Sequence, residues 1–270
     1  MCRHLAYLGP PASLRSVLVD PPHGLYRQAW APRRQRHGTV NADGFGAGWY
    51  APGDPVPARY RRAVPIWGDE SFADVARVTS AGALLAAVRC ATAVRCATAG
   101  TDPGIAAVAP YASGRWLFSH NGVLDGWPGS AAGLAATLPA GSLLGLGARV
   151  DSALLWALVR HRLELGLGAA DALADTIRAV WATGLAGRFN FLLTDGRVIA
   201  ATAAGDTLCY RVAGDAVVVA SEPGDDEPGW TEVPDGSVVT ATPQQVSVAE
   251  LAAPITQHAH HTEDGRIAIR

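Results

Sequence analysis

The sequence predicts an α+β protein in which two mostly antiparallel β-sheets lie between two layers of helices, a four-layer αββα sandwich. Short apolar or alternating runs bounded by Gly and Pro fill much of the first half of the chain, as is typical of strands. Two long segments with helical spacing follow each other in the middle, and short strands return after them. Strand blocks on both sides of a helical block favour two packed sheets covered by helices, within a single domain over residues 1–270.

The expected strands are short runs separated by turn-forming sequences such as Asp-Gly, Gly-Asp and Pro-Gly. They are Leu5–Leu8, Gly46–Tyr50, Arg59–Val64, Leu84–Val88, Trp116–Ser119, Asn190–Thr194, Val198–Thr202, Thr207–Val212, Ala216–Ala220 and Ser237–Thr240. Other segments lack internal proline and carry apolar residues at helical spacing, which predicts helices. They are Asp69–Val78, Asp151–Leu165 and Ala170–Thr183.

The composition limits the classes of function. With 49% hydrophobic residues in a chain of 270, there is enough apolar material for a large buried core. A net charge of −2 gives no general affinity for nucleic acid or for an anionic membrane surface. No apolar stretch reaches membrane-spanning length, and the first residues lack the apolar core of a signal peptide. We therefore expect a cytoplasmic protein with no nucleic-acid partner and no membrane partner.

The cysteine and histidine spacing favours neither disulfides nor a metal site. Four cysteines are too few for a disulfide framework, and Cys90 and Cys96 lack the spacing of a zinc ribbon. His258, His260 and His261 resemble a metal-binding cluster, but no cysteine or second histidine pair lies near them, so we interpret them as a solvated tail. We expect no metal and no cofactor.

The second residue, Cys2, is a candidate nucleophile. Removal of the initiator methionine would give it a free α-amine beside its thiol. These groups titrate near pH ~8 and ~8.5, so the amine is a candidate base and the thiolate a strong nucleophile. A cysteine in this position is also compatible with an ordinary small residue.

The sequence His120-Asn121-Gly122 directly follows an apolar strand. A side-chain amide and a flexible backbone N–H at a strand end have the composition of an oxyanion hole, in which each donor contributes about 3 kcal/mol. The alternative is a hairpin turn, because Asn-Gly is the preferred pair for a tight one. On these residues alone, the turn is the favoured interpretation.

Three alternating glycines lie in Asn41–Trp49, at the start of an expected strand. They allow close backbone approach on one face, or tight packing against a neighbouring strand. The segment is not a phosphate loop, because no Gly-Lys-Ser/Thr follows and the spacing does not match the dinucleotide fingerprint.

Two charged residues have both a structural and a functional interpretation. Asp151 opens an expected helix, where it would serve as an N-cap, or it could bind a substrate ammonium group. Arg89 ends the strand Leu84–Val88, where it is a solvated charge or a bidentate ligand for a carboxylate.

The basic run Arg33–His37 also has two interpretations. It could line the mouth of a pocket and meet a sulfoxide or a carboxylate. A solvated loop is the favoured alternative.

Five segments together resemble the class II glutamine amidotransferases of the N-terminal-nucleophile (Ntn) hydrolase superfamily. They occur in the family's order and cover nearly the whole chain. The segments are Met1–His4, Asn41–Trp49, Val88–Thr92, Ser119–Gly122 and Asp151-Ser152. Within the superfamily the chain is most similar to the γ-glutamyl hydrolases of ergothioneine biosynthesis. The resemblance implies the αββα sandwich of the Ntn hydrolases.

The resemblance also implies roles for individual residues. Cys2 would be the nucleophile, with its own α-amine as the base, and Asn121 and Gly122 would form the oxyanion hole. Asp151 would bind the α-ammonium of a γ-glutamyl substrate, and His120 belongs with the substrate-binding residues.

An arginine of the Val-Arg-x-Ala-Thr motif would bind the substrate's α-carboxylate. The segment Ala87–Thr92 repeats at once as Ala93–Thr98, so both Arg89 and Arg95 are candidates. We favour Arg89 because the apolar strand leads directly into it, although Arg95 has the family's downstream spacing.

The implied reaction is hydrolysis of γ-glutamyl-hercynylcysteine sulfoxide to glutamate and hercynylcysteine sulfoxide through a thioester on Cys2. No synthase region accompanies the glutaminase-like region in this sequence, which favours hydrolysis over ammonia transfer. Two alternatives stay open: a glutaminase subunit that supplies a separate synthase, and an inactive relative that binds ligands. The expected partner is a small γ-glutamyl molecule, and a homo-oligomer is possible.

Overall fold

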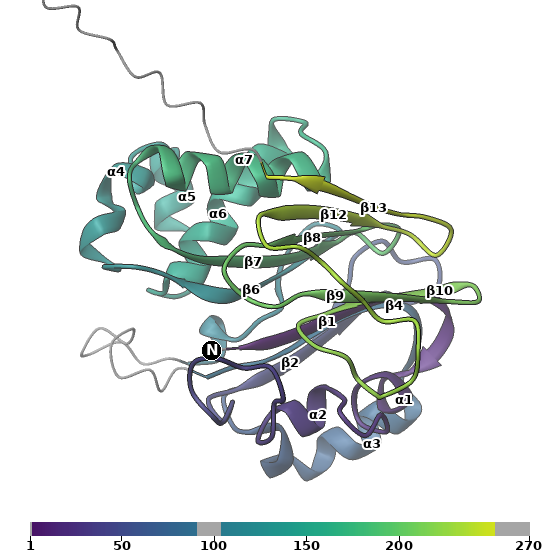
Figure 1. The fold of residues 1–270 in the computed structure, drawn as a ribbon. Helices are drawn as coiled ribbons and strands as arrows, with labels where there is room; N and C mark the ends of the chain where they lie inside the picture. The colour runs from purple at the N-terminus through teal and green to yellow at the C-terminus, as the bar shows by residue number, and fades with distance from the viewer. Residues whose placement is uncertain (1, 91–103, 252–270) are drawn as a thin grey trace, which may run out of the picture.

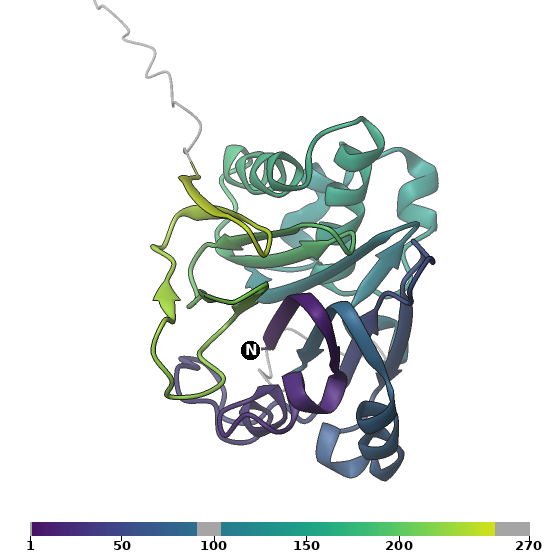
Figure 2. The same ribbon diagram turned by 90° about the vertical axis from the view of Figure 1, so that its right-hand side faces the viewer.

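The computed structural model describes residues 2–90 and 104–251. Over these residues the chain forms two antiparallel sheets that pack face to face, with helices on both outer faces (Figure 1). The predicted αββα order of layers is therefore confirmed. Figure 2 shows the same layers from the side, with α4–α7 above the sheets and α1–α3 below them.

The first sheet, in the described residues, has seven strands in the order β11-β9-β10-β1-β4-β2-β3. Their bounds are β1 (Arg3–Ser13), β2 (Phe45–Trp49), β3 (Ala58–Arg62), β4 (Ser80–Val88), β9 (Cys209–Ala213), β10 (Ala216–Ala220) and β11 (Thr231–Glu232). The second sheet has six described strands in the order β13-β12-β8-β7-β6-β5. These are β5 (Tyr111–Ser113), β6 (Trp116–Leu124), β7 (Gly187–Thr194), β8 (Ile199–Ala203), β12 (Ser237–Ala241) and β13 (Val246–Glu250).

The helices divide between the two outer faces. The first sheet is covered by α1 (Leu14–Leu18), α2 (Leu25–Gln28) and α3 (Glu70–Val78). The second is covered by α4 (Ala132–Ala135), α5 (Ala140–Leu144), α6 (Asp151–Glu164) and α7 (Ala169–Ala182). No helix of the described part is long and apolar enough to span a membrane.

Alternation along β1 fixes which side chains face the second sheet. Leu5 and Tyr7 pack toward α1–α3, whereas Ala6 and Leu8 lie in the core between the sheets. His4 follows the inward pattern and contacts Ser119 of β6, 3.2 Å from Nδ1 to Oγ. By the same period of two, Cys2 belongs to the inward face.

The turn that Asn121-Gly122 alone would favour does not form. The Asn121-Gly122 pair does not form a hairpin, because β6 continues through it to Leu124 and pairs with β7, with Asn121 opposite Asn190. The pairing supplies partners on the neighbouring strand, so the local preference of Asn-Gly for a turn is overridden. The oxyanion candidates consequently lie inside a strand rather than at its end.

Candidate active site

Cys2 immediately precedes β1, which lies at the centre of the first sheet between β10 and β4. In the β1–β4 register Arg3 pairs with Val88 and His4 with Ala87. Continuing this antiparallel register by one residue places Cys2 opposite Arg89. The sheet therefore brings the candidate nucleophile and the candidate carboxylate ligand together.

A small cavity lies at this point, with a volume of about 20 Å³, the room of roughly one water molecule. We call it the Cys2 cavity. Its polar lining residues are Cys2 just before β1, Arg89 just after β4, Tyr111 at the start of β5, Ser119 and His120 of β6, and Ser152 of α6. Of the residues predicted for the site, the cavity thus joins Cys2, Arg89 and His120.

Burial raises the pKa of the Cys2 thiol, while the nearby Arg89 guanidinium and a backbone hydrogen bond with Cys90 act in the opposite direction. Burial dominates, because removing a thiolate from water costs more than these contacts return. At neutral pH the thiol is therefore protonated, and a base is needed to make it a nucleophile.

The Arg89 main chain is fixed on both sides. Its N–H donates to the Gly44 carbonyl over 2.7 Å, and its own carbonyl accepts from the Asp43 N–H over 2.9 Å. The guanidinium Nη1 is buried and has no hydrogen-bond partner among the described residues. A buried, unpaired cationic donor beside Cys2 is suited to binding an anion such as a carboxylate.

Asn121 is fully buried, and neither its Nδ2 nor its Oδ1 has a hydrogen-bond partner in the described part of the chain. Ser119 meets His4, and Leu117 packs in the same core cluster as Ala6 and Leu8. The next inward residue of β6, Asn121, accordingly lies toward the Cys2 end of β1. Its unpaired amide N–H is a donor available to a substrate oxygen.

His120 points to the other face of β6, toward α6. Its Nε2 lies 2.9 Å from the Arg188 carbonyl, which can only accept, so Nε2 carries the proton. Its Nδ1 then accepts from the Ser152 hydroxyl at 2.9 Å. Burial lowers the pKa of His120, although the Asp151 carboxylate raises it in part. A neutral His120 with both nitrogens engaged lines the cavity and holds β6, β7 and α6 together.

Gly122 has no space for a side chain, because an added Cβ would overlap the Arg188 carbonyl oxygen and crowd the His120 ring. The glycine therefore permits the close pairing of β6 with β7 and the His120–Arg188 hydrogen bond. Its role as an oxyanion donor stays a prediction.

Asp151 is the first residue of α6, but it is not the N-cap expected from the sequence. The N-cap is Val150, whose side chain makes no capping bond. The Asp151 Oδ2 instead accepts from the Leu124 N–H at the end of β6, over 2.9 Å, and Oδ1 accepts from the Ser152 N–H over 2.7 Å. The carboxylate thus docks the start of α6 onto β6, next to the cavity. Binding of an ammonium group there stays a prediction.

Several predicted residues lie outside the described part of the chain. They are Met1, Arg95, Cys96, His258, His260 and His261. In the described residues, no group of three or more His, Cys, Asp or Glu side chains has the geometry of a metal site.

Sequence reasoning missed Ser119, Ser152, Tyr111 and His4. Ser119 precedes His120 and Ser152 follows Asp151, so both serines could have been predicted as neighbours of candidate site residues. Nothing in the sequence marks Tyr111, whose hydroxyl donates to the Ala107 carbonyl over 3.2 Å within the segment that lines the cavity. His4 belongs to the motif Met1–His4, but only the structure shows its contact with Ser119 between the sheets.

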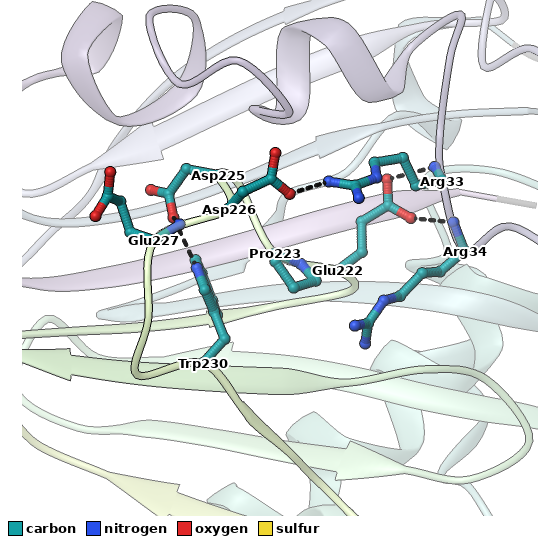
Figure 3. Close-up of a pocket in the computed structure, with 8 residues that line it drawn as sticks. All are labelled: Arg33, Arg34, Glu222, Pro223, Asp225, Asp226, Glu227 and Trp230. Atoms are coloured by element: carbon teal, nitrogen blue, oxygen red, sulfur yellow. Dashed lines mark hydrogen bonds and ion pairs between the residues drawn. The ribbon is translucent and has the colours of Figure 1, made fainter.

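The loop that begins at Arg33 is held in place by the buried Glu222 (Figure 3). Its two carboxylate oxygens accept from the backbone N–H groups of Arg33, over 3.0 Å, and Arg34, over 2.6 Å. Two residues further, the Gln35 Oε1 accepts from the Nε of buried Arg3 over 3.3 Å. The basic run is therefore anchored beside the start of β1, which the favoured solvated-loop interpretation did not anticipate.

Residues 25–214 match the family described as glutamine amidotransferases class-II. The chain belongs to the class II glutamine amidotransferases. Two relatives of this amidotransferase are named gamma-glutamyl-hercynylcysteine sulfoxide hydrolase. The Mycobacterium tuberculosis protein is 42% identical over 252 residues, which cover 93% of this chain and 97% of the relative. The Mycolicibacterium smegmatis protein is 42% identical over 251 residues, covering 93% and 100%.

Solved structures support the fold of this amidotransferase. A glutamine aminotransferase class-II domain protein from Silicibacter pomeroyi matches with a TM-score of 0.66 at 22% identity, covering 93% of this chain and all of the other. The glutamine phosphoribosylpyrophosphate amidotransferase of B. subtilis matches with a TM-score of 0.61 at 17% identity, covering 93% of this chain and 49% of the other. The two-sheet fold is that of Ntn-type amidotransferases.

Proposed function

We propose that this amidotransferase hydrolyses a γ-glutamyl amide bond with Cys2 as nucleophile. The observation that supports this most is the buried Nη1 of Arg89, which has no hydrogen-bond partner in the described part of the chain and belongs to a residue that lines the Cys2 cavity. A substrate carboxylate bound by this guanidinium would fix the amino-acid head of a γ-glutamyl group and orient its γ-carbonyl toward the sulfur.

In the proposed reaction the Cys2 sulfur attacks the γ-carbonyl carbon, and the thiol proton passes to the α-amine that removal of Met1 would expose. A C–S bond forms and the C–N bond breaks, while the nitrogen takes up a proton and leaves as an amine. Water then attacks the thioester, which releases glutamate and restores the thiol. The Asn121 amide and the Gly122 N–H would stabilise the oxyanion formed in each step.

The proposed substrate is γ-glutamyl-hercynylcysteine sulfoxide, and the products are glutamate and hercynylcysteine sulfoxide, in ergothioneine biosynthesis. This assignment is supported by the two mycobacterial relatives, which cover nearly the whole of this chain. A cytoplasmic location and a homo-oligomeric state stay predictions.

The experiment is to measure glutamate release from γ-glutamyl-hercynylcysteine sulfoxide by the purified protein and by its Cys2→Ala variant. We expect turnover in the wild type and none above background in the variant. Turnover by the variant near the wild-type rate would remove Cys2 from the mechanism.

Labelling provides an independent readout. Intact mass after brief treatment with a diazo-ketone analogue of glutamine should show loss of Met1 and a single adduct on Cys2. Cys209 is an internal control, because burial raises its pKa to about 12 and keeps its thiol unreactive. An adduct that persists in Cys2→Ala would contradict the assignment.

A further inference from the structure

A cavity of about 220 Å³ lies between the edge strands β3 and β5 and the helix α6. We call it the arginine cavity, because Arg59 and Arg61 of β3 and Arg160 of α6 line it. Its described lining contains no aspartate or glutamate. The cavity is smaller than the pockets of about 300–1,000 Å³ that hold drug-sized ligands, so it suits a small molecule.

Alternation along β3 places Arg59 and Arg61 on the same face of the strand. The residues between and after them lie on the opposite face, where both meet the Asp69 carboxylate. The Tyr60 hydroxyl donates to its Oδ2 over 2.8 Å, and the Arg62 Nε lies 3.1 Å from the same oxygen. Neighbouring arginines of one strand are thus separated into a paired one and two that line the cavity.

The helix α6 supplies the third guanidinium. Ala153, Ala157 and Arg160 recur at helical spacing, so one face of α6 brings all three to the cavity. The Arg160 Nε is buried and makes no hydrogen bond with the described residues, although the Glu164 Oε1 lies 3.3 Å away. Glu164 is exposed and does not line the cavity, so a donor of Arg160 is available to an occupant.

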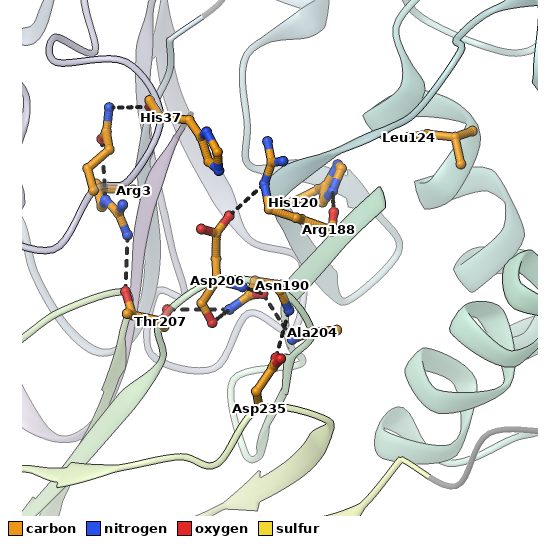
Figure 4. Close-up of polar contacts among 12 residues, drawn as sticks. Arg3, His37, His120, Leu124, Arg188, Asn190, Ala204, Asp206, Thr207 and Asp235 are labelled. Atoms are coloured by element: carbon orange, nitrogen blue, oxygen red, sulfur yellow. Dashed lines mark hydrogen bonds and ion pairs between the residues drawn. The ribbon is translucent and has the colours of Figure 1, made fainter. Parts of the chain in front are cut away.

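Within the described residues, no carboxylate pairs with Arg59 or Arg61. Arg188, by contrast, faces the Asp206 carboxylate, with 3.3 Å between Nε and Oδ2 (Figure 4). Burial lowers the pKa of Arg59 and of Arg61, and the Arg59 charge lowers the pKa of Arg61 further. Both guanidinium groups stay charged at neutral pH. An anion between them would therefore relieve the repulsion of two like charges.

The arginine cavity adjoins the segment that lines the Cys2 cavity, and Tyr111 lines both cavities. The Arg59 Nη1 donates to the Pro110 carbonyl over 3.3 Å, and the Arg61 Nη1 donates to the Val108 carbonyl over 3.0 Å. Each guanidinium has five N–H donors, so further donors stay available to a ligand. An occupant would therefore contact the side chains that hold one wall of the Cys2 cavity.

We propose that the arginine cavity binds the phosphate group of a small molecule, either free phosphate or a small phosphate monoester. Guanidinium groups match phosphate oxygens with paired N–H donors. A phosphate monoester carries about −1.5 to −2 charges at pH 7, so it suits three arginines better than a singly charged carboxylate does. The apolar part of a monoester would contact Leu146 and Trp156. The site is distinct from Arg89, and the inference does not depend on the proposed function.

Isothermal titration calorimetry with inorganic phosphate and with phenyl phosphate, at constant ionic strength, tests the proposal. We expect saturable binding to the wild type and an affinity about tenfold lower in Arg59→Gln and in Arg160→Gln, equivalent to about 1.4 kcal/mol. Arg62→Gln is the matched control, because it removes the same charge from the same strand outside the cavity, and it should bind like the wild type. Tighter binding of phenyl phosphate would identify a monoester as the ligand, and equal or tighter binding of inorganic phosphate would identify the free ion.

Arg89 is the competing cation, so Arg89→Ala is titrated in parallel and should retain the wild-type affinity. Loss of binding in Arg89→Ala with wild-type affinity in Arg59→Gln would place the anion in the Cys2 cavity and overturn the proposal. Absence of saturable binding to the wild type, or an equal loss in Arg62→Gln, would also overturn it. Arg59 and Arg160 lie on separate elements, so either variant tests the site if thermal unfolding shows that the other is not folded.

Discussion

Asn121 combines complete burial with two amide atoms that have no hydrogen-bond partner among the described residues. A buried amide without partners destabilises the folded state, by about 1–3 kcal/mol. Such groups are rare in native structures and need an explanation, and a substrate oxygen that completes the hydrogen bond during turnover provides one.

Asn121→Ala should therefore separate activity from stability. We expect kcat to fall by about 10²–10³, since one oxyanion donor is removed. We expect the melting temperature to stay constant or rise, because the substitution removes an unsatisfied polar group. Kinetics and thermal unfolding of the same preparation provide the check. A normal kcat with a lower melting temperature would assign Asn121 a structural role instead.

Arg89 and Arg95 can be compared in parallel variants. Arg89 lies opposite Cys2, and its Nη1 has no hydrogen-bond partner among residues 2–90 and 104–251, so Arg89→Ala should raise the KM for a γ-glutamyl substrate by tenfold or more. Arg95→Ala serves as the matched control from the repeated segment and should change KM by less than about threefold. Steady-state kinetics measure both, and equal small effects would mean that neither arginine binds the carboxylate.

The sequence predicted site residues whose side-chain chemistry is distinctive. It did not predict the local structure of residues that depends on which strands pair. Cys2, Arg89 and His120 were singled out from the sequence, and they line one cavity. The Asn121-Gly122 pair, considered alone, favoured a turn. The turn preference of a dipeptide carries no information about pairing with a distant strand such as β7. Asp151 was expected to cap its own helix, but the end of β6 competes for its carboxylate.

At the scale of elements, the glycines of β2 allow the segment before β5 to reach the Cys2 cavity. An added Cβ on Gly46 would overlap the Ala109 carbonyl oxygen, and one on Gly48 would crowd Leu117. On β3, the Arg61 Nη1 donates to the Val108 carbonyl over 3.0 Å. Val108 and Ala109 line the Cys2 cavity, so the shape of the cavity depends on a strand that contributes no side chain to it. The close approach expected for these glycines is confirmed.

Gly46→Ala should therefore impair catalysis and stability together. The methyl group would displace the segment around Ala109, and we expect a loss of about 1–3 kcal/mol in unfolding free energy and a fall in kcat/KM. Gly133→Ala, in α4, is the control, since an added Cβ there meets open space and should be neutral or slightly stabilising. Urea unfolding and kinetics of both variants test this, and wild-type behaviour of Gly46→Ala would disprove the steric argument.

The long and strongly patterned elements were predictable, whereas the short ones were not. Ala216–Ala220 has the predicted bounds, α6 ends one residue earlier than expected, and α7 begins and ends one residue earlier than expected. The strand at Trp116 was expected to stop at Ser119, since polar residues and a glycine follow. The helices α1, α2, α4 and α5 were missed, because four or five residues give too little periodicity to distinguish a helix from a loop.

At the scale of the whole molecule, the buried His4 joins the two sheets. Burial lowers the pKa of His4 well below 6.5, and the nearby Arg3 and His120 add to the effect. His4 links β1 to β6 through Ser119, so a proton on its ring would place an uncompensated charge between the sheets. A single domain over residues 1–270 stays a prediction.

The folded protein should accordingly lose stability in mild acid. Below pH 6.5 the unfolded chain takes up a proton on His4 that the folded state does not bind, so unfolding free energy falls by about 1.4 kcal/mol per pH unit for this proton. Above pH 6.5 the contribution is constant. Urea unfolding at pH 5.5 and 7.5 should show a smaller pH dependence in His4→Gln than in the wild type. Identical dependence in both would exclude His4 as the cause.

Another cavity, of about 310 Å³, is lined mostly by loop residues, among them Arg34, Arg36 and Asp206, whereas the Cys2 cavity takes part of its lining from β4, β6 and α6. Turns tolerate substitution and changes of length far better than paired strands do. Residues 34–36 and 232–235 can therefore be exchanged to change the shape and charge of this cavity while the paired strands next to Cys2 and Arg89 keep their register.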